Sequence, residues 1–137
     1  AEYVPWTSYG TSKTANVLHA RELARRLKEE GAPVTANALC PGLVDTDLGR
    51  YLVEGAAWWQ KPLVALLVPL TKQRAKTVPD GASTALYLSL DPALAAESGG
   101  YFVDSAPAIS TDIASDLQLA KELWDATDEL VAQRMQA

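Results

Sequence analysis

The side chains best suited to do chemistry in this sequence are a tyrosine and a lysine four residues apart, Tyr9 and Lys13. On a helix, positions four apart lie on the same face, so the lysine ammonium would sit one turn beyond the tyrosine hydroxyl. An ammonium beside a phenol stabilises the phenolate, which lets a tyrosine exchange protons closer to neutral pH. Carbonyl reduction needs this exchange, because an acid must protonate the oxygen while a hydride reaches the carbon. The spacing alone also fits a solvated pair on a helix surface.

A second polar segment follows a short run of strand-forming residues. Residues 34–39 carry small or β-branched side chains, which predicts a buried strand. Pro41 and Gly42 end this strand, and Val44 and Thr46 lie in the loop that follows. In open parallel sheets, ligands bind just beyond the carboxyl ends of the strands, so this loop is a candidate binding segment. A proline–glycine pair alone would be an ordinary strand end.

The tyrosine and lysine are expected on a long amphipathic helix over residues 7–30. Apolar residues recur at helical spacing on one face, and arginines with a lysine fill the other side. Thr7 or Ser8 would cap the start of this helix, and Gly31 followed by Pro33 would end it.

Further elements follow the predicted strand. We expect two short helices within residues 51–76, broken at Pro62 and Pro69. A further helix should run from Asp80 to Leu90 and end at Asp91 and Pro92. A strand over 101–103 and a last helix over 113–135, with a buried stripe from Leu117 to Val131, should follow. The order helix, strand, helices, strand, helix predicts a parallel α/β architecture with two strands and covering helices. Two strands make a poor free-standing sheet.

Composition narrows the classes of function. The chain has 137 residues, 48% of them hydrophobic, which predicts one packed domain. Its net charge of −5 argues against nucleic-acid binding, which needs clustered positive charge. Cys40 is the only cysteine and His19 the only histidine, so we expect neither a disulfide framework nor a metal site.

No targeting segment is visible in the sequence. Residues 1–10 lack the basic and apolar regions of a signal peptide, and the apolar run over 63–70 is far shorter than the ~20 residues of a membrane span. These features predict a cytoplasmic or organelle-facing soluble domain. The only methionine is Met135, so we expect residues upstream of Ala1 that were cleaved off or left out of the sequence.

Together the two motifs resemble the short-chain dehydrogenase/reductase family. That family carries Tyr-x-x-x-Lys on a helix, then a strand, then Pro-Gly-x-Val/Ile-x-Thr about thirty residues on, and residues 41–46 match every fixed position. Residues 9–18 and 34–39 are similar to the retinol dehydrogenase and WW-domain-containing oxidoreductase branch, as are the tail segments 100–104 and 120–124. The resemblance implies the C-terminal half of a doubly wound Rossmann-type parallel sheet. It covers nearly the whole chain and is weakest over 51–76.

The resemblance also implies a role for each motif residue. Tyr9 would be the general acid/base, and Lys13 would tune it and hydrogen-bond the nicotinamide ribose of NADP or NAD, with NADP slightly favoured. Val44 would hold the nicotinamide carboxamide through its backbone, and Thr46 would contact the carboxamide or pyrophosphate region. The remaining two motif residues would shape the turn so that the backbone can approach the cofactor, and both would line the cofactor site: Pro41 and Gly42.

The sequence departs from the family pattern in what it lacks. The glycine-rich Thr-Gly-x-x-x-Gly-x-Gly turn and the catalytic serine that precedes the tyrosine are absent. We therefore expect residues 1–137 to be the C-terminal portion of a single NAD(P)-binding domain, with 51–78 as the substrate lobe. Trp58, Trp59 and the leucine-rich run in that lobe suit an apolar alcohol or carbonyl, or equally plain core packing or an amphipathic surface helix.

Other readings stay open at this point. A truncated, non-catalytic module could keep the fold and use the Trp58–Trp59 region as a partner or membrane-surface patch, because Lys72, Arg74 and Lys76 adjoin the apolar run. In many members of the family the tyrosine-bearing helix forms a homodimer interface, a question that Arg21 and Arg25 on its outer face leave open.

Overall fold

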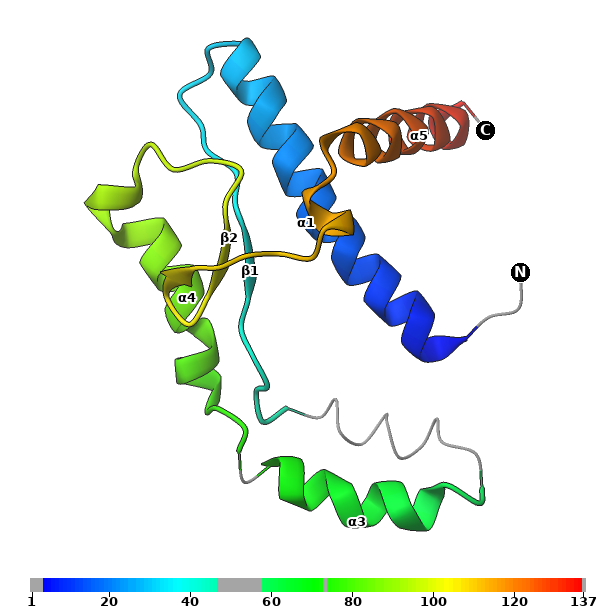
Figure 1. Ribbon diagram of the computed structural model, residues 1–137. Coiled ribbons are helices and arrows are strands. Elements are labelled where there is room, and N and C mark those ends of the chain that lie inside the picture. The colour runs from blue at the N-terminus through cyan, green and yellow to red at the C-terminus, as the bar shows by residue number, and fades with distance from the viewer. Residues whose placement is uncertain (1–3, 47–57, 73, 137) are drawn as a thin grey trace.

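The computed structural model describes residues 4–46, 58–72 and 74–136 of the chain. Its elements in chain order are α1 (Pro5–Glu29), β1 (Ala38–Cys40), α3 (Lys61–Lys72), α4 (Val78–Leu90), the 3₁₀ turn η1 (Pro92–Leu94), β2 (Tyr101–Val103), β3 (Ala106–Pro107), the 3₁₀ turn η2 (Ile113–Ser115) and α5 (Leu117–Met135). The strands lie between α1 with α5 on one side and α4 on the other, while α3 lies away from the sheet (Figure 1). The layered arrangement confirms the α/β prediction.

The sheet has the order β1-β2-β3. β1 and β2 are parallel, as predicted, with Leu39 opposite Phe102. β3 is a third, antiparallel strand that the sequence did not predict. Asp104 and Ser105 form the turn between β2 and β3 with φ of 53° and 56°, and no glycine or asparagine marks it in the sequence.

The strand β1 begins four residues later than predicted and extends to Cys40. Before it, the Asn37 side chain takes the place of strand pairing. Its amide donates to the carbonyl of Glu97 (2.7 Å), and its Oδ1 accepts from the backbone N–H of Gly100 (2.9 Å). The prediction of a strand over 34–37 was therefore wrong, because a side chain meets the hydrogen-bonding needs of the neighbouring segment there.

The long helix α1 was predicted at both ends, but its start differs in detail. It begins at Pro5 after Val4, and no side chain caps it, so the predicted capping by Thr7 or Ser8 was wrong. A proline in the first turn has a fixed φ suited to a helix and lacks an N–H that would have no helical acceptor there. The helix ends where predicted, with Gly31 at a φ of +65°.

A buried carboxylate on α1 joins this helix to α5. Glu22 is 1% exposed and accepts hydrogen bonds from Arg25 (two, each 2.7 Å) and Arg26 (2.7 Å). Arg26 also bonds Asp125 (3.0 Å) and lies 4.8 Å from the Trp124 ring centroid. The arginines that were predicted to fill the side of α1 opposite its apolar face thus surround a buried glutamate, which the sequence did not predict.

The last helix docks on α1 through its first turns only. Asp116 caps α5 by accepting from the backbone N–H groups of Gln118 and Leu119, and Ala120 is fully buried. The Trp124 ring stacks on His19 of α1 with centroids 4.8 Å apart. The predicted buried stripe stops near this point, because two of its later members are more than half exposed: Leu130 and Val131.

The middle helices start and end differently from the prediction. α3 is continuous through Pro69, so the predicted break there was wrong, whereas the start of α3 at Lys61 agrees with a helix beginning at Pro62. Pro62 is the second residue of α3, where a proline costs no helical hydrogen bond. Thr77, and not Asp80, caps α4, and its hydroxyl donates to the Asp80 carboxylate (2.6 Å). The helix predicted from residue 51 lies largely outside the described residues.

Replacing Glu22 by Gln should destabilise the fold and change its acid sensitivity. Hydrogen bonds from Arg25, opposed by burial and reinforced by Arg26, lower the pKa of Glu22 from 4.5 to about 2. The carboxylate therefore contributes its full stabilisation above about pH 4.5 and loses it as the pH falls toward 2. At pH 7 we expect Glu22→Gln to cost on the order of 2 kcal/mol after allowance for solvent screening.

Urea unfolding of the intact gene product at a series of pH values would measure this effect. The variant's free energy of unfolding should fall less steeply than the native protein's between pH 4.5 and 2. Glu29→Gln is the matched control, because Glu29 also bonds Arg25 but is exposed, and it should change stability little. Equal effects of the two substitutions would contradict the assignment.

Candidate functional site

The tyrosine and lysine of the first motif share one face of α1, near its start. The Lys13 Nζ lies 5.3 Å from the centroid of the Tyr9 ring. Both side chains are exposed, Tyr9 by 48%, so the hydroxyl is open to a ligand. Ser12 donates to the backbone carbonyl of Tyr9 (2.7 Å), so this serine hydroxyl is turned back onto its own helix. The geometry places a cation and a phenol together at an open surface.

The loop after β1 is held by a short pairing with the segment before α4. Val44 and Lys76 form a parallel bridge, in which the Lys76 N–H donates to Leu43 (2.8 Å) and the Asp45 N–H donates to Lys76 (2.9 Å). Gly42 precedes this bridge with a φ of +78°, a conformation that glycine adopts without strain. The Lys76 side chain covers this glycine, since a Cβ there would lie 3.5 Å from its Cε and Nζ.

The bridge leaves the backbone N–H and C=O of Val44 directed away from Lys76, toward the other edge of the extended segment. Successive residues of an extended strand direct their N–H and C=O groups to alternate edges. Because Leu43 and Asp45 use theirs toward Lys76, the N–H and C=O of Val44 point away from it and have no backbone partner among the described residues. One donor and one acceptor therefore stand side by side, as a carboxamide would require.

Close packing on α4 fixes the position of Val44. A Cβ at Gly81 would lie only 2.6 Å from the Val44 Cγ2, so the backbone of α4 touches this side chain directly. Only a glycine fits at that position with Val44 where it is. The side chain of Val44 is thus used for packing, which leaves its backbone for recognition.

The β2–β3 turn completes the support of the loop. Lys76 forms an ion pair with Asp104, and the backbone N–H of Ser105 donates to the buried hydroxyl of Thr84 (3.0 Å). Sequence reasoning missed both Lys76 and Gly81 as residues of the site. A glycine inside the helix predicted over 80–90 was the one available signal, since glycine is unfavourable there unless packing demands it.

A second tyrosine, Tyr101, lies on β2 and is partly buried beside Cys40. Burial raises the pKa of Tyr101 above 10, and the neighbouring Cys40 raises it further. Tyr101 therefore stays protonated at neutral pH. Among the tyrosines that the structure describes, Tyr9 is exposed, whereas Tyr87 and Tyr101 are half-buried.

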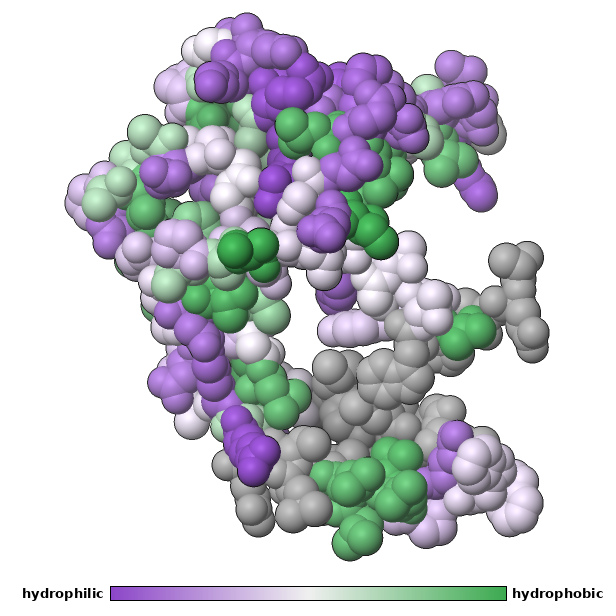
Figure 2. Space-filling model, viewed as in Figure 1, coloured by the Kyte–Doolittle hydropathy of each residue, from purple (hydrophilic) through white to green (hydrophobic). Residues whose placement is uncertain are grey.

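The two groups of site residues do not contact each other in the described part of the chain. Tyr9 and Lys13 lie near the start of α1, and the loop with Pro41, Gly42 and Thr46 follows β1. Figure 2 shows an open space on this face between the start of α1 and the elements around the loop. Tyr9, Lys13, Pro41, Gly42 and Thr46 are exposed, and Val44 is half-buried.

Residues 4–46, 58–72 and 74–136 contain neither a metal-binding cluster nor a helix that could cross a membrane. No three His, Cys, Asp or Glu side chains there come together to hold a metal ion. No helix in these ranges combines the length and the apolar character that crossing a membrane requires.

Comparison with known proteins agrees with the arrangement of fold and motifs. The sequence model of the short chain dehydrogenase family matches residues 1–57. The short-chain dehydrogenase TIC 32 B, chloroplastic, of Brassica napus is 38% identical over 90% of this chain, which covers 36% of that relative. Retinol dehydrogenase 14 of Homo sapiens is 41% identical over 90% of the chain, and polyprenol dehydrogenase of Mus musculus is 36% identical over 89%; the chain covers 34% of each.

The fold and the motifs together define a partial Rossmann-like α/β unit. The chain is similar in sequence to the short-chain dehydrogenase/reductase family, and over 90% of its length to the TIC 32 and retinol dehydrogenase members of that family. It spans about a third of the length of the relatives it matches.

Adding a methyl group at Gly81 should displace the candidate binding loop. Gly81→Ala would push its Cβ into the Val44 side chain, so we expect a loss of about 1–3 kcal/mol in the free energy of unfolding. The amide resonance of Val44 should shift as the loop moves.

Gly10→Ala is the matched control for this prediction. A Cβ at Gly10 would meet no atom within 4 Å, so that variant should keep or slightly gain stability. If both variants unfold at the same urea concentration, the packing of Val44 on α4 does not fix the loop.

Proposed function

We propose that the protein carrying this chain is an NAD(P)-dependent oxidoreductase that interconverts an alcohol and a carbonyl on a small apolar substrate. The observation that supports this most directly is the Lys13 ammonium beside the exposed ring of Tyr9. In this proposal residues 1–137 are the C-terminal portion of a single nucleotide-binding domain. The relatives are named as dehydrogenases, which agrees with the reaction class.

Tyr9 is the proposed general acid/base. Its hydroxyl donates a proton to the carbonyl oxygen in reduction and takes it back in oxidation, while the bound nucleotide supplies or accepts the hydride. Lys13 is the proposed contact to the nicotinamide ribose, and its ammonium lies beside the Tyr9 ring on the same helical face, one turn away. No carboxylate is paired with either group in the described residues.

The loop after β1 fits the nicotinamide end of such a cofactor. A carboxamide offers one acceptor and an NH₂ donor, and the unused N–H and C=O of Val44 match this pair. Gly42 lets the backbone approach a ligand closely, with Pro41 setting the turn. Thr46 is exposed beyond them and would contact the carboxamide or pyrophosphate region. NADP or NAD would fit these residues equally.

Residues 51–78 are the proposed substrate lobe. The described part of it carries exposed apolar side chains at helical spacing on α3, namely Leu63, Leu66 and Leu67, and Trp59 is exposed in the turn just before this helix. Figure 2 shows this apolar surface gathered on α3. An apolar substrate would cover it, and retinol and polyprenol, in the names of two relatives, are apolar alcohols.

A membrane-surface role is the second candidate for the same segment. Residues 58–79 contain four cations and no acidic residue, within a chain whose net charge is −5. An apolar helix face with this charge suits an anionic lipid surface. Co-sedimentation of the intact gene product with anionic and neutral vesicles separates the candidates, since a substrate lobe predicts no preference for anionic lipid.

Removing one hydroxyl should abolish turnover without changing the fold. We expect Tyr9→Phe to lower kcat by about 10²–10⁴-fold in the intact gene product, because only the proton donor is lost. Dissociation constants for NADPH and NADH, followed by nucleotide fluorescence, should change much less than kcat.

Two controls accompany this variant. Lys13→Met should weaken nucleotide binding as well as turnover, because it removes the proposed ribose contact. Tyr87→Phe removes a hydroxyl from a tyrosine on α4 that packs edge-on against Phe102, and it should leave kcat unchanged. Full activity in Tyr9→Phe would falsify the catalytic assignment.

Polar substitutions on α3 should act on substrate binding. We expect Leu63→Ser and Leu66→Ser each to lower kcat/KM for an apolar alcohol by about tenfold, mainly through KM, because each removes apolar contact area. Leu90→Ser is the control, since Leu90 is 73% exposed at the end of α4. A loss of vesicle binding with unchanged KM would instead favour the membrane role.

A further inference from the structure

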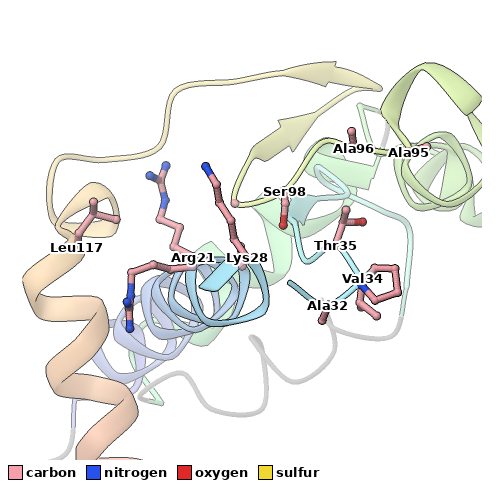
Figure 3. Close-up of a pocket in the computed structure, with 13 residues that line it drawn as sticks. Arg21, Lys28, Ala32, Val34, Thr35, Ala95, Ala96, Ser98 and Leu117 are labelled. Atoms are coloured by element: carbon pink, nitrogen blue, oxygen red, sulfur yellow. The ribbon is translucent and has the colours of Figure 1, made fainter. Parts of the chain in front are cut away.

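A cavity of about 680 Å³ lies at the other end of α1 from the proposed catalytic pair. Its walls come from the last turns of α1, from residues 32–35 that lead into β1, from residues 95–99 that lead into β2, and from Leu117 at the start of α5. Figure 3 shows Lys28 extending from α1 between Leu117 and Ser98. The size is that of a pocket for a small organic molecule.

The charged groups that line this cavity are all cations. Arg21, Arg25 and Lys28 recur at helical spacing on one face of α1, and no acidic residue lines the cavity. The charge of Arg25 is already matched by Glu22 and Glu29. Arg21 and Lys28 form no ion pair with a carboxylate in the described part of the chain.

Arg21 is the less satisfied of these two cations. Its Nη2 donates to the neutral hydroxyl of Ser110 (3.1 Å), and its Nε is buried with no acceptor in the described residues. Arg21 is partly buried and has no carboxylate partner in the described residues, so an anion in the cavity would complement its charge. Arginine is also the side chain best shaped to bind a carboxylate or phosphate group.

The remaining walls of the cavity are mostly small and apolar. Ala32, Pro33 and Val34 form one wall, and Ala95 and Ala96 form another. The Thr35 hydroxyl lies among them and makes no hydrogen bond in the described residues. An inorganic anion would leave these walls bare, whereas a short apolar body attached to the anionic group would cover them.

We propose that this cavity binds a small amphiphilic anion, a carboxylate or phosphate monoester on a short apolar chain. Arg21 and Lys28 hold the anionic group, and the alanine and valine walls hold the apolar body. Lys28 lies fifteen residues beyond Lys13 on the same helix, roughly 22 Å along its axis. The cavity also adjoins the amino ends of the strands, whereas Pro41 follows the carboxyl end of β1. The site is therefore separate from the proposed oxidoreductase site and does not depend on that activity.

Isothermal titration of the intact gene product would test this site with four probes. Octanoate and octyl phosphate carry the apolar body, while acetate and inorganic phosphate do not. We expect saturable binding of at least one octyl probe and about tenfold or more weaker binding of its short counterpart. The relative affinities of octanoate and octyl phosphate identify the preferred anionic group.

Three variants locate the binding. Lys28→Gln should weaken binding of the octyl probe about tenfold, and Ala96→Glu, which places an acid at an exposed wall position, should abolish it. Arg134→Gln is the matched control, because it removes one positive charge from the last turn of α5, outside the cavity. It should leave the affinity unchanged.

Several outcomes would overturn the proposal. These are the absence of saturable binding, equal affinity for octyl and short probes, and equal loss in Lys28→Gln and Arg134→Gln. Circular dichroism of each variant confirms that the fold is intact, and Lys28 and Ala96 are both exposed, so neither substitution disturbs a packed core.

Discussion

The position of α1 depends on one buried carboxylate. Glu22 is fully enclosed, yet it remains ionised because two arginines of the same helix hydrogen-bond it. One of these arginines, Arg26, continues across to Asp125 and the ring of Trp124 on α5. This network of charged side chains therefore holds α1 and α5 together. Since α1 also carries Tyr9, the orientation of this tyrosine follows from these contacts.

The candidate binding loop depends on a different kind of constraint. Two contacts hold this loop in place: the backbone bridge of Val44 with Lys76, and the packing of the Val44 side chain against Gly81 of α4. The ion pair of Lys76 with Asp104 then fastens this arrangement to the turn of the sheet. A loop held in this way has little freedom to adjust when a ligand arrives, so much of the ordering cost of binding is met during folding.

Local signals in the sequence located most elements. Helical spacing and Gly31 gave the extent of α1, and the residues Tyr101–Val103 were a strand as predicted. The motif spacing also placed Tyr9 and Lys13 on one face. The antiparallel strand β3 was not predicted, because Asp104 and Ser105 form its turn with positive φ and the sequence has no glycine there to indicate such a turn. Burial of Glu22 and the roles of Lys76 and Gly81 arise from contacts between segments distant in sequence, which no local pattern records.

The side chain of Val44 packs on α4 while its N–H and C=O have no backbone partner in the described residues, and this limits how the sequence can vary. A ligand that reads only a peptide group is indifferent to the side chain attached to it, whereas the helix behind Val44 is sensitive to that side chain's volume. The volume of the side chain at position 44, and not its chemical character, therefore limits which residues fit there. A larger residue at position 44 would need more space on α4, and a residue larger than glycine at position 81 would need a smaller one at position 44. Variation at the two positions should therefore be coupled, even though neither position needs to contact a substrate through its side chain.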